Sequence, residues 1–174
     1  MPTRYEDAPE EVETLLRKIR FEHFPELVNA KIRVLFDLKK RGSKGMVCLG
    51  RIVKANDLIR HLTTDKGLAE GYDYIITLDK VCWDNIANGD REKIIRHELR
   101  HTFFDIESED NPYRLIDHDI TDFYAEVEVN RDDPKWRERC ASLTADIYDQ
   151  MKDSGRKVQR SKKTPLEIVA ETGR

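Results

Sequence analysis

Alternating apolar and polar residues predict three β-strands in the first half of the chain. Apolar side chains occupy every second position over 32–38, and the apolar run 46–55 follows the basic, glycine-bearing segment 39–45. Successive side chains on a strand point to opposite faces, so the first run predicts a strand with one buried face. The short turn after it predicts an antiparallel hairpin with the second run. The alternating run 72–79 predicts a third strand.

Apolar residues at helical spacing predict helices around these strands. One helix is expected between Pro9, which can open a helix, and Pro25, which interrupts it. A short helical piece over 81–87 leads to a longer helix near 90–104. An acidic loop is expected to follow over 105–117.

The last third of the chain predicts two further helices. The first is expected near 119–130, with Ile120, Phe123 and Val127 pointing inward. The second is expected to open at Pro134. Its apolar side chains recur at helical spacing and predict one buried stripe, formed by Trp136, Cys140, Leu143, Ile147 and Met151.

Together these elements predict an α+β fold, in which a small, mostly antiparallel or mixed sheet of about three strands packs on the helices. The domain is expected to cover residues 1–153. The remaining residues, 154–174, are poor in apolar side chains and rich in lysine and arginine. They are therefore expected to form a basic, flexible tail.

The composition gives no sign of a membrane protein or of a general nucleic-acid binder. Charged residues make up 37% of the chain, the net charge is −3, and no apolar run approaches the roughly 18 residues of a membrane span. The first residues lack the apolar core of a secretion signal. Cys48, Cys82 and Cys140 are odd in number and lack paired spacing, which predicts free thiols and a cytoplasmic location.

The most specific motif is the segment His97-Glu98-Leu99-Arg100-His101, which has the pattern H-E-x-x-H. Residues four apart lie on one face of a helix, so both imidazoles can bind one zinc ion. The glutamate would then stand beside the metal and take a proton from a zinc-bound water. The sequence therefore predicts one zinc ion per chain, with His97 and His101 as ligands and Glu98 as the catalytic base.

A helical wheel places this motif between two different faces of the predicted helix. Ile95 and Leu99 lie on an apolar face that is expected to meet the core. Lys93, Arg96 and Arg100 lie on a basic face that is expected to meet water. A catalytic metal site fits such a boundary, because its ligands need fixed positions while its open coordination position needs access.

The third zinc ligand is left open between one histidine and two glutamates. A catalytic zinc usually has three protein ligands and one open position. The downstream candidates are His118, at the start of the next predicted helix, and Glu126 or Glu128 within it. The metzincin arrangement is excluded, because Phe104 and Glu107 stand at the positions of its glycine and its third histidine.

Several short segments combine with the motif into a longer pattern: Tyr74-Ile-Ile-Thr-Leu-Asp79, Trp83, His97-Glu-Leu-Arg-His101, Asp105 and His118-Asp-Ile-Thr-Asp-Phe123. In this order they resemble the phage metallopeptidase family and, more distantly, SprT-like zinc peptidase domains, over roughly residues 10–130. The resemblance implies a small zincin-like domain, with His118 joining the two motif histidines as ligand and Glu98 as catalyst. Two positions depart from the family pattern: Asp117, where glycine is expected, and Arg100, where a small or apolar residue is common.

The predicted reaction is hydrolysis of peptide bonds, with zinc lowering the pKa of a water molecule and Glu98 moving its proton to the leaving amine. A further donor should steady the oxygen that gains negative charge, and Tyr113 and Tyr124 are candidates near the site in sequence. A peptide substrate is expected to add as a strand to a sheet edge formed by 72–79. The ligand imidazoles need hydrogen-bond acceptors, which are expected among Asp105, Asp117, Asp119 and Glu126.

Two other functions stay open from the sequence. One is a zinc-stabilised binding module without hydrolysis, which would hold a buried metal with no open coordination position. The other is association with nucleic acid, because clustered basic side chains can contact phosphates. These side chains are Lys39, Lys40, Arg41 and Lys44 in the predicted turn, and Arg156, Lys157, Arg160, Lys162 and Lys163 in the tail.

Overall fold

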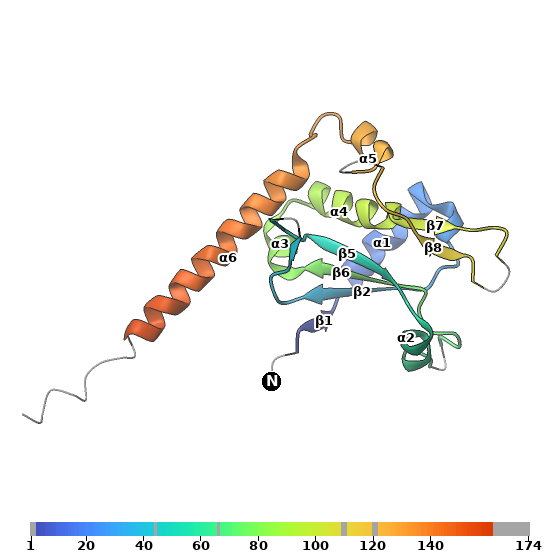
Figure 1. Ribbon diagram of the computed structural model, residues 1–174, viewed down its shortest axis with the longest axis horizontal. Helices are drawn as coiled ribbons and strands as arrows, with labels where there is room; N and C mark the ends of the chain where they lie inside the picture. The colour runs from blue at the N-terminus through green and yellow to red at the C-terminus, as the bar shows by residue number, and fades with distance from the viewer. Residues whose placement is uncertain (1–2, 44, 66, 109–110, 120–121, 162–174) are drawn as a thin grey trace, which may run out of the picture.

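A four-stranded mixed sheet forms the centre of the protein in the computed structural model (Figure 1). The structure describes residues 3–161 except 44, 66, 109–110 and 120–121. In spatial order the strands are β1 (Tyr5–Asp7), β2 (Ile32–Asp37), β6 (Tyr74–Asp79) and β5 (Gly50–Lys54). β6 runs parallel to β2 and antiparallel to β5, and β1 is antiparallel to β2.

The α+β class and the mixed sheet are confirmed, but the predicted hairpin between 32–38 and 46–55 is wrong. β6 lies between β2 and β5 and pairs with β2 in register along its whole length. The chain after β2 closes a separate ribbon of β3 (Gly42–Ser43) and β4 (Met46–Val47). Alternation shows which face of a strand is buried, but it does not show which neighbour the strand bonds to.

Helices α1 (Glu10–His23) and α4 (Asn88–Arg100) lie against the sheet (Figure 1). α1 begins directly after Pro9 and ends before Pro25, as predicted. Apolar side chains from both helices and from every second position of β2 and β6 meet in one core. This core includes Val12, Leu16 and Ile19 of α1, Ile95 and Leu99 of α4, and Val34, Phe36, Ile76 and Leu78 of the sheet.

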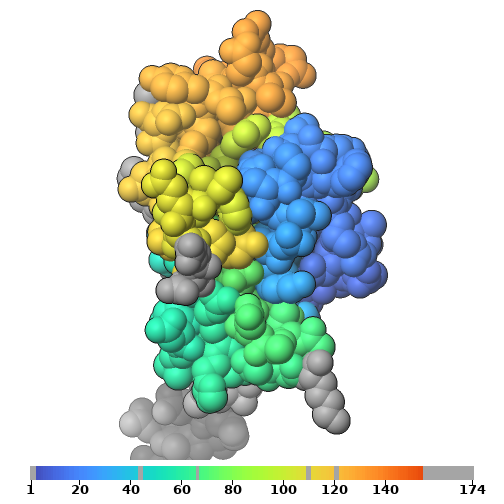
Figure 2. Space-filling model, turned by 90° about the vertical axis from the view of Figure 1, so that its right-hand side faces the viewer, coloured from blue at the N-terminus to red at the C-terminus, as the bar shows by residue number. Residues whose placement is uncertain are grey.

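A second small ribbon follows α4. β7 (Thr102–Phe104) pairs antiparallel with β8 (Tyr113–Leu115), so the helix predicted to reach residue 104 ends earlier, and the predicted loop 105–117 contains a strand. Figure 2 shows this ribbon in yellow, beside α1 in blue. The other short elements are a 3₁₀ helix (Pro25–Leu27), α2 (Asp57–Leu62), α3 (Lys80–Asn85) and α5 (Tyr124–Val129).

The last helix, α6 (Trp136–Ser161), packs on α3 and β4 through its first half and projects from the body of the domain beyond it (Figure 1). Its buried stripe differs from the predicted one, because Leu143 is 41% exposed and Met151 is 57% exposed. The helix is rotated so that two small residues and a tyrosine face the core in their place. The buried positions are Trp136, Cys140, Ala141, Thr144 and Tyr148.

The proposed domain boundary at 153 stays a prediction. α6 continues through this position to Ser161, while 162–174, including Leu166–Ala170, lie outside the described residues. Within the described part of the chain, no helix is long and apolar enough to cross a membrane. Cys48, Cys82 and Cys140 are all free, as predicted.

Candidate metal centre and active site

The two histidines of the motif lie on one face of α4. His97 is buried within the helix, and His101 forms its C-cap with backbone angles that are still helical (φ −68°, ψ −12°). The helical turn between them brings their ring centroids to 5.4 Å. The hydroxyl of Thr102 donates to the carbonyl of Leu99, which closes the last turn before the chain enters β7.

A third histidine meets this pair from another part of the fold. His118 lies on the segment between β8 and α5, and its ring centroid is 4.9 Å from that of His97 and 4.5 Å from that of His101. One nitrogen of each ring lies within 4.8 Å of the others, and the Nε2 atoms of His97 and His118 are 3.0 Å apart. Three imidazoles bound to zinc at 2.0–2.1 Å would place their nitrogens roughly 3.3 Å apart in a tetrahedral site. The residues present therefore fit a metal ion such as zinc.

The outer nitrogens of two rings face acceptors, which leaves the inner nitrogens for a metal. Nδ1 of His97 lies 2.9 Å from Oδ1 of Asp122, although the ring N–H does not point straight at that oxygen. Nδ1 of His101 lies 2.8 Å from the carbonyl oxygen of Ile116. Such partners fix the orientation of an imidazole, so both Nε2 atoms can face one centre. Sequence reasoning missed Asp122, whose only signal was its position four residues after His118.

Burial favours the neutral form of His97 and His118, which is the form that binds metals. It lowers the pKa of His97, although Asp122 opposes this effect. It also lowers the pKa of His118 to about 4, with further contributions from His97 and His101. Desolvation disfavours the charged ring, and each neighbouring cation adds repulsion.

Glu98 lies directly beside this cluster, with its carboxylate buried against β5. Burial raises the pKa of this carboxyl to about 7, while the backbone N–H of Ile52 and the charge of Arg137 oppose the rise. Gly50 lies so close that a β-carbon built there would stand 2.8 Å from Oε1 of Glu98. A glutamate with a pKa near neutrality can accept and release a proton at physiological pH.

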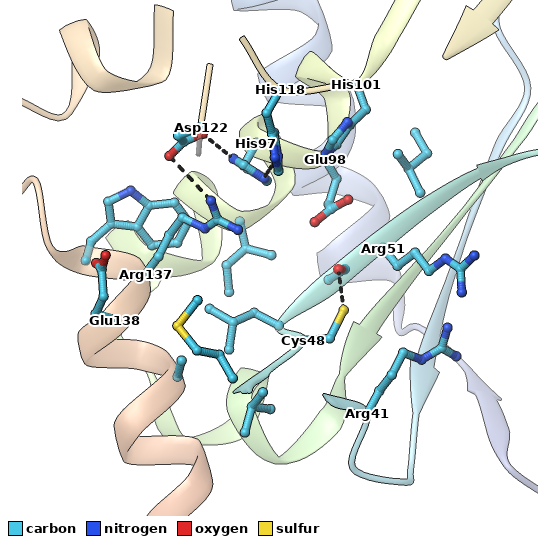
Figure 3. Close-up of a pocket in the computed structure, with 18 of the residues that line it drawn as sticks. Arg41, Cys48, Arg51, His97, Glu98, His101, His118, Asp122, Arg137 and Glu138 are labelled. Carbon is cyan, nitrogen blue, oxygen red and sulfur yellow. Dashed lines mark hydrogen bonds and ion pairs between the residues drawn. The ribbon is translucent and has the colours of Figure 1, made fainter. Parts of the chain in front are cut away.

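The three histidines and Glu98 line a cleft of about 970 Å³. α4 supplies its floor, β4, β5 and the segment before them supply one side, and the start of α6 supplies the other (Figure 3). His101 and His118 are only partly buried, so the cluster opens onto this cleft.

The four carboxylates expected to accept hydrogen bonds from the ligand histidines have different surroundings in the structure. Asp117 lines the cleft and is exposed. Asp119 accepts from the backbone N–H of Tyr124 at the start of α5. Asp105 accepts from the backbone N–H of Glu107 within its own turn.

The fourth, Glu126, is completely buried and binds arginine instead of histidine. Arg96 donates to both of its oxygens at 3.0 Å, and Arg100 donates to one at 3.2 Å. The expectation that Arg96 and Arg100 face water is therefore wrong. The expected inward position of Val127 is also wrong, because its side chain is 46% exposed. Glu126 points inward from α5, where it pairs with Arg96 and Arg100. The expected position of Ile120 lies outside the described residues.

The two tyrosines do not lie in the cleft wall. Tyr113 packs against Tyr74 and Phe104, with ring centroids 5.7 Å from each. Tyr124 is 64% exposed at the first position of α5. Among the described residues, neither contributes to the lining of the cleft.

The sheet edge beside the cleft is β5, not the strand over 72–79. β6 is flanked by β2 and β5 and has both edges paired. The prediction that the substrate binds along residues 72–79 is therefore wrong, because the free edge belongs to the neighbouring strand β5. β5 pairs with β6 on one side only and carries Gly50 and Ile52 beside Glu98.

Comparison with known proteins supports the same picture. No curated protein and no solved structure matches the chain. A family model described as "Putative phage metallopeptidase" matches residues 3–152, which include the three histidines, Glu98 and Asp122. Since this match covers far more than half of the 174 residues, the chain belongs to the phage metallopeptidase family.

Proposed function

We propose that this protein is a zinc-dependent peptidase of zincin-like architecture, with His97, His101 and His118 as ligands and Glu98 as the general base. The observation that carries this proposal is the convergence of three imidazole nitrogens within 4.8 Å in the wall of a cleft, next to a buried carboxylate. Three protein ligands with access from a cleft are typical of catalytic zinc, whereas structural zinc is enclosed by four.

Held by the three histidines, zinc would supply a Lewis acid and lower the pKa of a water molecule. Glu98 would take a proton from the attacking water as the water oxygen forms a bond to the carbonyl carbon of the peptide. The proton then passes from the carboxyl of Glu98 to the peptide nitrogen, and the bond between carbon and nitrogen breaks. The backbone N–H of Ile52 helps to keep this carboxylate charged.

A peptide substrate would lie along β5. This strand forms one edge of the sheet among the described residues and borders the cleft. Extended peptides bind such edges through backbone hydrogen bonds. A peptide added there passes Gly50, which leaves the carboxylate of Glu98 within reach of the scissile bond.

The alternatives are less well supported. A zinc-stabilised binding module needs an enclosed metal, whereas His101 and His118 are partly exposed to the cleft. For association with nucleic acid, Arg41 already pairs with Asp37 at 2.9 Å, and Lys44 and the end of the tail lie outside the described residues.

The proposal is tested by metal analysis and a hydrolysis assay on the purified protein. We expect about one zinc per chain and cleavage of fluorescein-labelled casein, which a chelator abolishes and added zinc restores. His97→Ala, His101→Ala and His118→Ala should each weaken zinc binding by orders of magnitude. His61→Ala, which removes an exposed histidine of α2, is the matched control and should keep both properties.

Glu98→Gln separates catalysis from metal binding. It should retain zinc and the fold but lose cleavage, because glutamine has the same shape without the basicity. Zinc retention by all three histidine variants would contradict the metal site. Equal cleavage by Glu98→Gln would contradict the role of the base.

A further inference from the structure

Among the described residues, three arginines line the cleft, and one of them, Arg137, lies at the histidine cluster. Arg41 is held by Asp37 at 2.9 Å and by the hydroxyl of Tyr5 at 3.1 Å. Figure 3 shows the guanidinium groups of Arg41 and Arg51 near each other at the right, apart from His97. The same view shows Arg137 beside His97, across the cleft from β5.

The first turn of α6 fixes the position of Arg137. The preceding residue, Trp136, is buried, and its ring centroid lies 6.4 Å from that of His97. Nη1 of Arg137 lies 3.7 Å from Oδ2 of Asp122, the carboxylate whose other oxygen faces His97. The side chain is 32% exposed, so its guanidinium is anchored at the site and still reaches the cleft.

The charge of Arg137 lies beside the histidine cluster, next to the carboxylate that faces His97. The partial positive charge at the N-terminal end of α6 adds to it, because Pro134, Trp136 and Arg137 all line the cleft. This end of α6 therefore brings positive charge to the cleft beside His97, while the carboxylate of Glu138 in the same turn also lines it.

We propose that Arg137 donates a hydrogen bond to the substrate carbonyl oxygen as that oxygen becomes negatively charged. This inference rests on the proposed peptidase function and assigns the donor that neither Tyr113 nor Tyr124 supplies from the cleft wall. A guanidinium presents five N–H donors in one plane, so Arg137 can keep its ion pair with Asp122 and also donate to the oxygen. The charge develops only after water has added to the carbonyl carbon, so this donor raises the turnover rate more than it tightens substrate binding.

The first test measures the kinetics of Arg137→Gln. We expect kcat to fall by about 10²–10³-fold, while KM changes only a few-fold and zinc affinity is unchanged. Arg137→Lys keeps the charge without the planar fork and should lie between the wild type and Arg137→Gln. Arg41→Gln removes the same charge from the same cleft and should behave like the wild type. Equal kcat values for Arg137→Gln and Arg41→Gln would overturn the proposal.

The second test needs no turnover. The zinc-loaded protein is titrated by calorimetry with a phosphinic pseudopeptide, which carries a negative oxygen at the position of the attacked carbonyl, and with the uncharged amide of the same sequence. Arg137→Gln should weaken phosphinate binding by about 100-fold and leave amide binding unchanged. An equal loss for both probes, or a loss of zinc, would mean that Arg137 acts only through Asp122 and His97, and would overturn the inference.

The two proposals can fail separately. If the wild type binds phosphinate through Arg137 but cleaves no peptide, the peptidase function fails while the anion-binding role of Arg137 stands. If the wild type cleaves peptides and Arg137→Gln cleaves them equally well, the peptidase function stands and the role of Arg137 fails.

Discussion

Asp122 faces His97 across 2.9 Å, with its other oxygen 3.7 Å from Arg137. This carboxylate therefore connects a candidate metal ligand with the cation of the opposite cleft wall. It lies on the segment that also carries His118, so one short stretch of chain supplies a candidate ligand and the acceptor for another. The proximity of His97 and Arg137 helps to lower the pKa of Asp122, which keeps the carboxylate charged despite its burial.

Asp122→Asn should weaken zinc binding by about 10–100-fold, the range found when the acceptor of a ligand histidine is replaced. The variant keeps the shape of the side chain but loses the charge that orients His97. Competition with a chromophoric chelator measures the affinity. Asp117→Asn is the matched control, because it neutralises an exposed carboxylate in the same cleft. Equal zinc affinities of the two variants would contradict the assigned role of Asp122.

The sequence predicts those parts of the site that follow from local geometry. The spacing of His97 and His101 on a helix requires them to share a face, and the structure shows this. For His118 the sequence left Glu126 and Glu128 as alternatives, and both the family resemblance and the position of His118 at a helix entrance favoured the histidine. The reason is that the path of the chain between β8 and α5 decides which of these side chains reaches the motif helix.

The sequence does not predict which charged or polar side chains are buried because they pair with each other. A helical wheel assigns Arg96 and Arg100 to water because both are charged. In the fold they are covered by α5, since Glu126 compensates their charge. The same limit applies to the rotation of α6. The hydroxyl of Tyr148 donates a hydrogen bond to Asp79 inside the core, so the helix buries Tyr148 and leaves Leu143 exposed.

A chain that ends at Asp153 should keep the thermal stability of the full chain. The last buried side chain of α6 among the described positions is Tyr148, and residues 151–154 are exposed. Ending the chain at Asp146 removes Tyr148 and its 2.9 Å hydrogen bond to Asp79, so this shorter form should melt many degrees lower. Thermal unfolding of the three lengths measures the difference. A large drop for the form ending at Asp153 would show that later residues pack on the core.

Glu126→Gln should destabilise the protein by about 3 kcal/mol, because it leaves two arginines without their buried counter-charge. Glu126 is fully buried and binds Arg96 and Arg100. Urea unfolding of the metal-free protein measures this free energy without a contribution from zinc. Glu128→Gln is the control on the same helix: Glu128 is exposed, its partner is Arg131, and surface pairs contribute little. Equal unfolding free energies of the two variants would contradict the role of the buried pair.

Gly50→Ala should abolish hydrolysis while the protein keeps its fold and its zinc. A β-carbon at this position would stand 2.8 Å from Oε1, 3.1 Å from Cγ and 3.2 Å from Cδ of Glu98. Glu98 is buried, so its carboxylate must shift from its present position to make room for the methyl group. The three atoms nearest to the new methyl group all belong to Glu98, so zinc binding should be preserved.

Gly89→Ala is the matched control for this substitution. Gly89 lies in the first turn of the same motif helix, and a β-carbon there meets nothing within 4 Å. Alanine favours the helix over glycine by up to about 1 kcal/mol, so this variant should be as active as the wild type and no less stable. Casein cleavage, zinc content and thermal unfolding are measured for both variants. If Gly50→Ala cleaved casein as fast as Gly89→Ala, the position of the Glu98 carboxylate against β5 would not matter for catalysis, and its assignment as the base would lose its geometric support.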